Sequence, residues 1–510
     1  MTAIRRVLVA NRGEIALRII RACHEEGLEA VAVYSEADRL APHVRAADLA
    51  VAIGPAPAPA SYLDAGKLVD AALATGCQAV HPGYGFLAER APFAEAVEAA
   101  GLVFVGPSPA AIRAMGDKTE ARRRMQAAGV PIVPGTTRPV ADVAQARVEA
   151  GRLGFPVLLK AAAGGGGKGM RLVRDEGELV AAFPRAQSEA AKAFGAGELY
   201  LEKYLERPRH VEIQVLGDAF GRVVALGERE CSIQRRHQKL IEEAPSVAVT
   251  PALRRRMSDA ATAAASAVGY ASAGTIEFLL TPAGEFYFLE MNTRLQVEHP
   301  VTELVYGVDI VREQLRVAMG RPLRVHVGTL QPRGHAIECR ITAEDPFNDF
   351  LPATGVVRYL RAPTGPGVRW DAGVEAGNEI TLHYDPLIAK LCVWGETRAA
   401  ALERMRRALR ELVIVGLPTS QAFHLRVMDD PDFRRGDFDI TYLERAGARL
   451  LQAELAAELV RPLAVTAALL AEARRTAASA PPAAPGTPLG RPGAPLSAWS
   501  LAARREALRS

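Results

Sequence analysis

The sequence predicts a mixed α/β and α+β fold, and three observations predict it. Residues 7–34 have the pattern strand, turn, amphipathic helix and strand, a βαβ opening that favours a parallel sheet. Residues 210–216 alternate with the period of two expected of a strand. The apolar runs 275–280 and 286–291 are separated by a Pro-Ala-Gly turn, which predicts an antiparallel hairpin.

Composition indicates an ordinary globular chain. Its 510 residues, 49% hydrophobic and 24% charged, allow a large core and two to four subdomains. The net charge of +4 is small for this length and gives no support for nucleic acid or membrane as a main partner. Five scattered cysteines argue against a disulfide framework or a thiolate metal site, so we expect a reducing cytoplasm. We also expect no targeting segment, because no apolar run approaches a length of about 18 residues.

Lysine is rare and unevenly placed. The chain has eight lysines beside 54 arginines, and six of the eight lie between Lys118 and Lys239. Lysine is a compact point charge suited to phosphate, whereas arginine is the better residue for rigid surface pairs. The enrichment therefore predicts a phosphate site in this part of the chain.

The N-terminal part is expected to alternate strands and helices. Strands are predicted over 7–10, 30–34 and 78–80, and helices over 14–26 and 61–75. The turn between the first strand and the first helix lacks the glycine pattern of a dinucleotide site, which argues against a nicotinamide cofactor.

A glycine-rich loop, His81 to Phe86, follows the strand over 78–80. Loops at the carboxyl ends of parallel strands are where ligands bind. A turn that only needs permissive glycines is an equally good interpretation of this loop by itself.

After a helix over 118–128, the segment 131–205 has a strand pattern of its own and is interpreted as an inserted subdomain. A strand over 155–160 ends on Lys160, and a glycine run with Lys168 follows it. The run contains G-x-G-x-x-G, but a strand over 170–173 follows instead of the helix of a dinucleotide site. Glycine instead of Ser or Thr follows Lys168, so it is no Walker A motif. We expect a mobile glycine hairpin that folds over phosphates; a flexible linker leaves the two lysines unexplained.

A dense polar run, 228–239, follows the strand over 210–216 and its return strand. Such a run is usually a solvated face. A basic loop that holds a small anion is the alternative, favoured here because Lys239 belongs to the lysine cluster.

Further helices are predicted over 251–270 and 300–319. A strand over 335–341 carries Glu338 and Arg340 on one face, where they could pair with each other. The remainder, with a helix over 397–412, is interpreted as α+β and completes a domain by about Glu444.

The hairpin over 275–291 carries the densest set of candidate site residues. It is expected to set Glu277 near Glu290, and Glu290, Asn292 and Arg294 would share one face. Two carboxylates and an amide oxygen suit a hard cation, most naturally Mg²⁺ holding a nucleotide's phosphates. For Glu277 alone, a solvated outer strand face is the competing interpretation. The polar side chains from Glu290 to Glu298 are too costly to bury unless they satisfy one another or a ligand.

Taken together, these segments resemble the biotin carboxylases. These are the ATP-grasp component of acetyl-, propionyl- and methylcrotonyl-CoA carboxylases and of pyruvate carboxylase. The resemblance covers about Ile4 to Glu444 and is specific, because separate motifs match in order. They are Ala10-Asn11-Arg12-Gly13-Glu14-Ile15-Ala16, His81-Pro82-Gly83-Tyr84-Gly85-Phe86-Leu87, the glycine run, His237-Gln238-Lys239, Glu290 to Glu298 and Glu338-Cys339-Arg340.

The resemblance implies an ATP-grasp fold in four parts. These are a Rossmann-like βαβ domain over 1–117, an ATP-grasp region over 118–319 with a mobile lid subdomain at about 131–205, a C-terminal α+β domain over 320–445, and an Ala/Arg/Pro-rich helical and flexible tail over 446–510.

It also implies roles for individual residues. ATP would be bound by Lys118, Lys160, Gly164, Gly165, Gly166, Gly167, Gly169, Glu202, Lys203, Tyr204, Leu205, His210, Gln234, His237, Glu277 and Glu290. Two Mg²⁺ or Mn²⁺ ions would be held by Glu277, Glu290 and Asn292. Bicarbonate and biotin would be bound by Lys239, Arg294, Gln296, the backbone of Val297, Arg340 and Tyr84. Lys239, Arg294, Glu298 and Arg340 would be catalytic, with Glu298 as the general base.

The implied reaction carboxylates biotin on a biotin carboxyl carrier protein, through carboxyphosphate. The chain has no Met-Lys-Met biotinylation motif and ends before a carboxyltransferase could begin, so we expect separate carrier and transferase chains or a truncated longer protein. The resemblance suggests a homodimer. The alternatives are another ATP-grasp ligase that joins a carboxylate to an amine, and a non-catalytic nucleotide-binding subunit.

Overall fold

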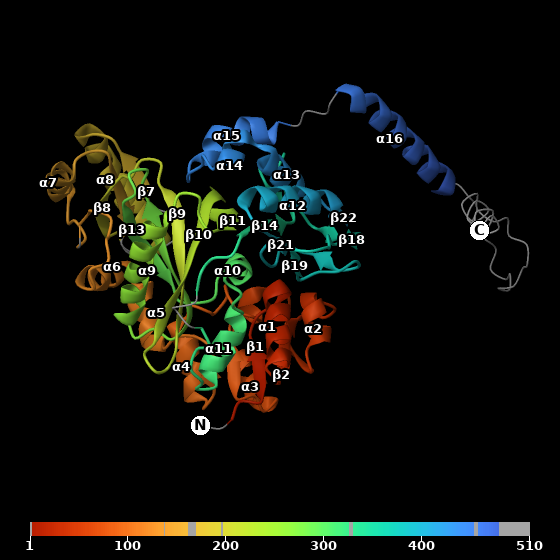
Figure 1. Ribbon diagram of the computed structural model, residues 1–510, viewed down its shortest axis with the longest axis horizontal. Helices are drawn as coiled ribbons and strands as arrows, with labels where there is room; N and C mark the ends of the chain where they lie inside the picture. The colour runs from red at the N-terminus through yellow and green to blue at the C-terminus, as the bar shows by residue number, and fades with distance from the viewer. Residues whose placement is uncertain are drawn as a thin grey trace, which may run out of the picture. The chain divides into compact units, whose positions relative to one another are not determined.

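A computed structural model describes residues 3–136, 138–161, 170–194, 197–325, 330–452 and 457–478 (Figure 1). Contacts divide the chain into two compact units, Met1–Gln452 and Ala453–Ser510. The predicted glycine run, including Gly164, Gly165, Gly166, Gly167 and Gly169, lies outside the described residues.

A parallel sheet opens the first unit and confirms the βαβ prediction. Its five strands have the order β3-β2-β1-β4-β5, and all pairings are parallel. The chain moves outward in one direction from β1 and then returns to its other side at β4, so the loops after these two strands meet at a topological switch point. The strands are β1 (Arg6–Val9), β2 (Glu29–Ser35), β3 (Leu49–Gly54), β4 (Ala79–His81) and β5 (Val103–Phe104). The helices are α1 (Gly13–Glu25), η1 (Glu36–Asp38), α2 (Pro42–Ala46), η2 (Ala58–Ala60), α3 (Ala65–Ala74), α4 (Ala91–Ala99) and α5 (Pro109–Gly116).

A smaller sheet occupies the middle of the segment 131–205. Its three strands have the antiparallel order β7-β6-β8 and pack with α7 and α8 around a core of their own. Its elements are α7 (Val143–Leu153), β6 (Val157–Ala161), β7 (Met170–Val173), α8 (Glu176–Phe194) and β8 (Leu199–Lys203), and α6 (Lys118–Ala127) precedes the segment.

An eight-stranded antiparallel sheet forms the centre of the unit, in the order β13-β12-β9-β10-β11-β14-β21-β19. The pairing of β11 with β14 joins the central part of the chain to the C-terminal part in one continuous sheet. Its strands are β9 (Arg209–Gly217), β10 (Val223–Arg235), β11 (Gln238–Ala244), β12 (Ser272–Leu280), β13 (Phe286–Asn292), β14 (His335–Thr342), β19 (Val368–Ala372) and β21 (Leu387–Gly395). The helices along it are α9 (Pro251–Ser266), α10 (His299–Tyr306), α11 (Ile310–Ala318) and α12 (Arg398–Glu411).

Short strands and helices complete the first unit. They are β15 (Glu344–Asp345), β16 (Leu351–Pro352), β17 (Gly355–Val356), β18 (Tyr359–Arg361), β20 (Glu379–Ile380), β22 (Val413–Val415), α13 (Gln421–Asp429), α14 (Pro431–Arg435) and α15 (Tyr442–Leu451). Helix α15 buries Ala446 and Leu450 in the core under the C-terminal strands, so residues 446–452 pack with this unit.

The second unit is described only over α16 (Ala457–Ala478). The predicted proline-rich linker over 480–495 lies outside the described residues. No helix in the described ranges has the length and apolar character needed to cross a bilayer.

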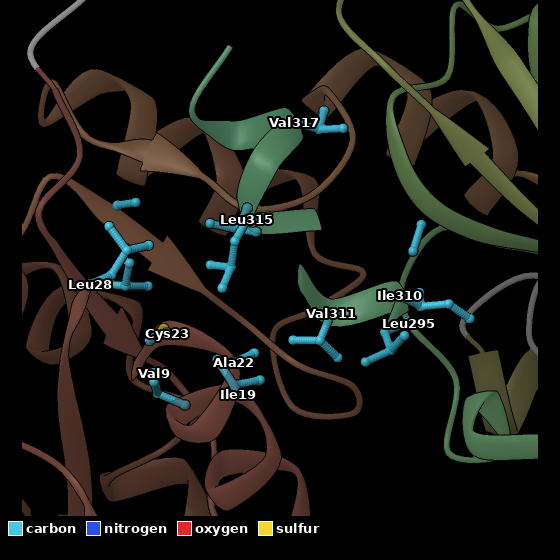
Figure 2. Close-up of a cluster of buried hydrophobic side chains, with 14 of the residues drawn as sticks. Val9, Ile19, Ala22, Cys23, Leu28, Leu295, Ile310, Val311, Leu315 and Val317 are labelled. Atoms are coloured by element: carbon cyan, nitrogen blue, oxygen red, sulfur yellow. The ribbon is translucent and has the colours of Figure 1, made fainter. Parts of the chain in front are cut away.

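Helix α11 binds the parallel sheet to the rest of the unit. Its Val311 and Leu315 are buried against Ile19 and Cys23 of α1 and Val9 of β1 (Figure 2). Both helices present apolar residues at intervals of three and four, which places them on one face. This core fixes the loop after β1 relative to the central sheet.

Two sequence expectations need correction. The single helix expected over 300–319 is two helices, because Gly307 ends α10 in the left-handed conformation and Asp309 caps α11 by accepting from Arg312 N at 2.9 Å. The polar run 228–239 is neither a solvated face nor a loop over most of its length. It forms the end of β10 and the start of β11, and only Arg236 and His237 make the turn, both with positive φ.

The first three charged residues of this run are buried because each meets a partner from another element. Glu228, Arg229 and Glu230 are at most 1% exposed. Their ion-pair partners are Arg254 for Glu228, Glu212 for Arg229 and Arg209 for Glu230.

Replacing Leu315 by Ala should lower the free energy of unfolding by about 2–5 kcal/mol, because it opens a cavity between α11 and α1. Thermal denaturation measures the effect as a lower midpoint. Leu73→Ala on α3, where the side chain is 51% exposed, is the matched control and should change the midpoint little. Equal midpoints for the two variants would contradict the packing described.

Candidate functional site

A cavity of about 690 Å³ lies in the first unit, between the loops after β1 and β4, the ends of the central strands and the small sheet. Most of the residues singled out from the sequence line it. They are Tyr84, Lys118, Lys160, His210, Gln234, His237, Lys239, Glu277, Glu290, Asn292, Arg294, Gln296, Val297, Glu298 and Arg340. Glu202, Lys203, Tyr204 and Leu205 are not among the described residues that line it.

The N-terminal loops meet at the wall of the cavity because Asn11 ties them together. Its side-chain amide donates to the carbonyl oxygens of Pro82 and Tyr84, both at 2.7 Å. The Tyr84 hydroxyl donates to Glu14 on α1. On the same wall the guanidinium of Arg12 lies 4.2 Å from the ring centroid of Tyr384.

The predicted hairpin forms as expected, with Glu277 directly opposite Glu290 and Thr275 opposite Asn292. Burial and the nearby Glu277 carboxylate raise the pKa of Glu290. Within the described residues Glu290 has no ion pair, so its carboxylate is available to a cation. The Asn292 amide oxygen accepts from Arg294 Nη2 at 2.8 Å.

The donor set fits a divalent cation. Glu277 and Glu290 present carboxylate oxygens from paired strands, and oxygen ligands of this kind suit a hard divalent ion. In the described part of the chain, His210, Glu212 and Glu277 have ligand atoms that lie within 4.8 Å of one another. The Lys239 ammonium contacts both carboxylates of this group, so the two acids already have a cationic partner.

Lys239 stands at the centre of the site. Its ammonium donates to Glu212 at 2.5 Å, to Glu277 at 3.0 Å and to Glu298 at 2.7 Å. Burial alone would lower the pKa of Lys239, but the three carboxylates raise it well above its ordinary value. The ammonium is therefore charged at any working pH.

Glu298 lies between two cations. It accepts from Lys239 and from Arg340 Nη2 at 3.0 Å, and it is 2% exposed. Burial raises its pKa, but Lys239, Arg340 and the more distant Arg229 outweigh this and hold the pKa well below its ordinary value. Glu298 is thus an ionised carboxylate near neutral pH.

Arg340 pairs with Glu242 and Glu298, not with Glu338 as expected from the strand pattern. Glu338 points from the same strand but accepts only from the Cys392 thiol, at 3.2 Å. The backbone carbonyl of Arg340 accepts from Ser420 Oγ and lies 2.6 Å from His424 Nε2, which fixes the strand behind the guanidinium.

The loop after β13 brings Arg294, Gln296 and Val297 to the cavity. Arg294 Nε donates to Glu89 Oε2 at 2.8 Å, and Gln296 Nε2 donates to Glu277 at 2.8 Å. The carbonyl of Val297 accepts from Lys390 Nζ at 2.8 Å.

The lysine cluster is only partly gathered at the cavity. Lys118, Lys160 and Lys239 line it, and Lys160 forms an ion pair with Glu202. Lys203 instead donates to the carbonyls of Gly154 and Phe155 inside the small sheet's own subdomain.

Sequence reasoning missed the partners that hold the site residues. Arg229, 0% exposed, donates to Gln296 at 2.6 Å, and Lys390, also 0% exposed, holds Val297. Glu89, Glu212 and Glu242 hold Arg294, Lys239 and Arg340. A lysine inside the apolar run 387–393 was a usable signal for Lys390, since a lone charge in a buried strand needs a partner.

Comparisons with known proteins cover nearly all of the first unit. Three family models match: "Biotin carboxylase, N-terminal domain" over 3–112, "Carbamoyl-phosphate synthase L chain, ATP binding domain" over 117–326, and "Biotin carboxylase C-terminal domain" over 338–445. Biotin carboxylase from Nostoc sp. is 53% identical over 439 residues, which are 86% of this chain and 98% of that protein. A pyruvate carboxylase subunit from Methanothermobacter thermautotrophicus is 52% identical over 440 residues, 86% of this chain and 89% of that protein.

A solved structure agrees. The biotin carboxylase domain dimer of Hydrogenobacter thermophilus 2-oxoglutarate carboxylase, in complex with MgADP, ADP and bicarbonate, matches with a TM-score of 0.84 and 49% identity. The match covers 89% of this chain and 100% of that chain.

Replacing Lys239 by Met should destabilise the protein by about 3–5 kcal/mol near neutral pH, because three buried carboxylates lose their cation. In the unsubstituted protein the lowered pKa values of Glu277 and Glu298 give stability that is present above their ordinary pKa of about 4.3 and lost as pH falls. In the variant burial raises these pKa values, so stability falls as pH rises. Thermal midpoints should therefore differ most at neutral pH and draw together only as the pH falls well below about 4.

The matched control is Lys67→Met, which removes an exposed ammonium 3.9 Å from Asp64. It should shift the midpoint little at any pH. A Lys239→Met variant whose midpoint tracks that of the unsubstituted protein across the pH range would contradict the buried charge network.

Proposed function

The chain belongs to the biotin carboxylase family, and we propose that it catalyses the ATP-dependent carboxylation of biotin by bicarbonate, giving N1′-carboxybiotin, ADP and phosphate. The observation that carries the proposal is the Lys239–Glu298–Arg340 chain of ion pairs beside the Glu277–Glu290 hairpin in one cavity. The family and the ATP-grasp fold expected from the sequence motifs are confirmed. The reaction would be the first half of an acyl-CoA carboxylase, such as an acetyl- or propionyl-CoA carboxylase, or of a pyruvate carboxylase.

The nucleotide would bind between the small sheet and the central sheet. Lys118 and Lys160 line that part of the cavity with His210, Gln234 and His237, and cationic groups there would offset the phosphate charge. Glu277, Glu290 and Asn292 are the proposed holders of Mg²⁺ or Mn²⁺, two ions in all. When bound, such ions neutralise phosphate oxygens and orient the terminal phosphate for attack.

Bicarbonate would bind at Lys239, Arg294, Gln296 and the backbone of Val297. Bicarbonate and the terminal phosphate of ATP repel each other, so cations on both sides are needed before they can react. In the ligand-free protein Lys239 and Arg294 are paired with protein carboxylates. An entering anion would share these cations, which weakens the hold of Lys239 on Glu298.

Glu298 is the proposed general base. Its low pKa keeps it in the ionised form that accepts a proton, but the same low pKa makes it a weak base while Lys239 and Arg340 both contact it. When the substrates are present, Lys239 would also contact bicarbonate and Arg340 would also contact biotin. Weaker contacts with Glu298 would then raise the proton affinity of that carboxylate. Deprotonated bicarbonate would attack the terminal phosphate and give carboxyphosphate.

Arg340 is proposed to face biotin together with Tyr84. Carboxyphosphate would release CO₂ and phosphate, the phosphate would take the N1′ proton of biotin, and N1′ would then attack the carbon of CO₂ to give N1′-carboxybiotin. The guanidinium of Arg340 would then stabilise the negative charge that develops on the ureido oxygen. Exclusion of water would protect carboxyphosphate from hydrolysis.

The partners follow from the reaction. Biotin would arrive on a biotin carboxyl carrier protein and leave for a carboxyltransferase, and the acceptor depends on that transferase. We propose a homodimer, which the dimeric Hydrogenobacter domain supports. A cytoplasmic location is supported by five cysteines that are all free and buried.

The deciding assay is phosphate release from ATP, measured with and without bicarbonate and with and without free biotin. Release that needs both supports a biotin carboxylase. An ATP-grasp ligase of the carboxylate–amine type would ignore biotin, and a non-catalytic protein would release no phosphate in any arm.

Glu298→Gln should lower biotin-dependent phosphate release by at least about 100-fold while nucleotide affinity is kept, because the amide cannot accept the proton. Steady-state phosphate release and nucleotide titration measure the two effects. Glu285→Gln, at the exposed turn of the β12–β13 hairpin, is the control and should behave as the unsubstituted protein. Undiminished turnover in Glu298→Gln would refute the base assignment.

Glu290→Gln should raise the Mg²⁺ concentration needed for half-maximal phosphate release by about tenfold or more, because one anionic oxygen ligand becomes a neutral amide. A magnesium titration at fixed ATP measures it, with Glu285→Gln again as the control. An unchanged magnesium requirement would remove Glu290 from the metal site.

A further inference from the structure

A row of polar side chains crosses the central sheet directly behind Arg340. Glu242 on β11 is paired in register with Glu338 on β14, and Glu338 is paired with Cys392 on β21. All three residues are 0% exposed. The two carboxyl groups are therefore neighbours on one face of the sheet, without access to water.

Each of the two carboxyl groups has one satisfied oxygen and one unsatisfied oxygen. Glu242 Oε1 accepts from Arg340 Nε at 2.6 Å, whereas Glu242 Oε2 is buried without a partner among the described residues. Glu338 Oε2 accepts from the Cys392 thiol at 3.2 Å, and Glu338 Oε1 is likewise buried without a partner within the described ranges.

Glu338 cannot be a stable carboxylate in these surroundings. A thiol is a weak donor, and a buried carboxylate with only that donor carries a large desolvation cost. The nearby Lys390 does not relieve it by a hydrogen bond, because its ammonium is directed to the Val297 carbonyl and to Glu14 at 3.1 Å. A proton on Glu338 removes the desolvation cost of a buried charge. It also supplies an O–H donor for Glu242 Oε2 on the neighbouring strand β11.

Burial and the neighbouring carboxylates favour that proton, and they outweigh the opposing charges of Lys390 and Arg340. Burial, with the Glu298 carboxylate adding to it, raises the pKa of Glu242 to about 7. Burial, with Glu242 adding to it, raises the pKa of Glu338 well above its ordinary value. Two adjacent buried carboxyl groups lose their second proton at a higher pH than their first, because like charges at short range repel. The charged and titratable groups that face the two are Arg340, Lys239, Lys390, Glu298 and Cys392.

We propose that Glu338 is a neutral acid whose O–H donates to Glu242 Oε2, and that the Glu242–Glu338 pair is a positioning element that holds one negative charge behind Arg340. The functional part of this inference rests on the proposed placement of Arg340 beside biotin. Glu338 touches no substrate and acts through Glu242 and the guanidinium.

The proton sets how much positive charge Arg340 offers to the cavity. With one proton on the pair, the guanidinium is balanced by Glu242 and by Glu298. Loss of the proton adds a second negative charge behind the Arg340 guanidinium. This charge attracts the guanidinium away from the cavity and opposes the entry of bicarbonate. Activity should therefore fall on the alkaline side as the pair ionises.

The test is the pH profile of kcat/KM for free biotin in Glu338→Gln. Its amide NH₂ donates to Glu242 as the acid does but does not ionise in this range. We expect activity near neutral pH within about threefold of the unsubstituted protein, and an alkaline fall that is absent or moved up by at least about one pH unit. Glu338→Leu, which lacks the donor, should lose about tenfold or more at all pH values. An alkaline limb that is unchanged in Glu338→Gln would overturn the proposal.

Glu243→Gln is the matched control. Glu243 is the next residue on β11 and equally buried, but it pairs with His335 and Arg398, away from Arg340. It should keep the alkaline limb of the unsubstituted protein. Loss of the limb in this control as well would assign it to sheet stability and overturn the proposal.

A second readout does not depend on activity. The infrared difference between the unsubstituted protein and Glu338→Gln at neutral pH should contain the carbonyl stretch of a protonated carboxylic acid. In Cys392→Ser a stronger hydroxyl donor replaces the thiol, so that band should move to lower wavenumber, even if Glu338→Gln folds poorly. An absent band, or a band that Cys392→Ser leaves in place, would overturn the proposal. Failure of biotin-dependent phosphate release with the band present would instead count against the proposed function alone.

Discussion

Burial of charge around one ammonium is the constraint on which the rest of the structure depends. Lys239 on β11 meets Glu212 from β9, Glu277 from β12 and Glu298 from the start of α10. None of these carboxylates could stay buried without a cation, and the ammonium could not stay buried without them. The pairing of β9 with β12 places two of the acids side by side, so the backbone ladder and the ion pairs reinforce each other. The cations of the site are thus held in position by protein carboxylates, and substrate anions would bind by exchanging partners rather than by ordering free side chains.

Much of this site could be predicted from local sequence because its geometry is local. A turn between two apolar runs is enough to set Glu277 opposite Glu290, and strand alternation is enough to put Asn292 on the same side. The βαβ opening followed from periodicity, and its loops meet where parallel strands end. Ordered motifs then indicated the family, which single positions could not have done.

The rest could not be predicted because it depends on partners far away in the chain. Arg229, in the polar run, and Glu242, just beyond it, look like surface charges, and only the contacts with Gln296 and Arg340 explain why they are buried. The expected pairing of Glu338 with Arg340 failed for the same reason, since a nearer acid on the adjacent strand took the guanidinium. The undivided helix over 300–319 was a different kind of error, because a glycine stop and an aspartate cap were visible in the sequence at Gly307 and Asp309.

The continuity of the eight-stranded sheet limits how such a protein can be divided. Most of strand β14 lies in the part matched by the C-terminal family model, yet the strand pairs along one side of β11, in the part matched by the ATP-binding model. A fragment that stops before His335 would leave β11 as an open edge, with unpaired backbone groups available to any other strand. The boundary between the matches of the two family models therefore reflects sequence similarity. It is not a structural boundary at which the two regions could be exchanged by recombination. A relative that carries only the ATP-binding region would have to protect that edge by other means, such as charged side chains, a bulge or a covering segment.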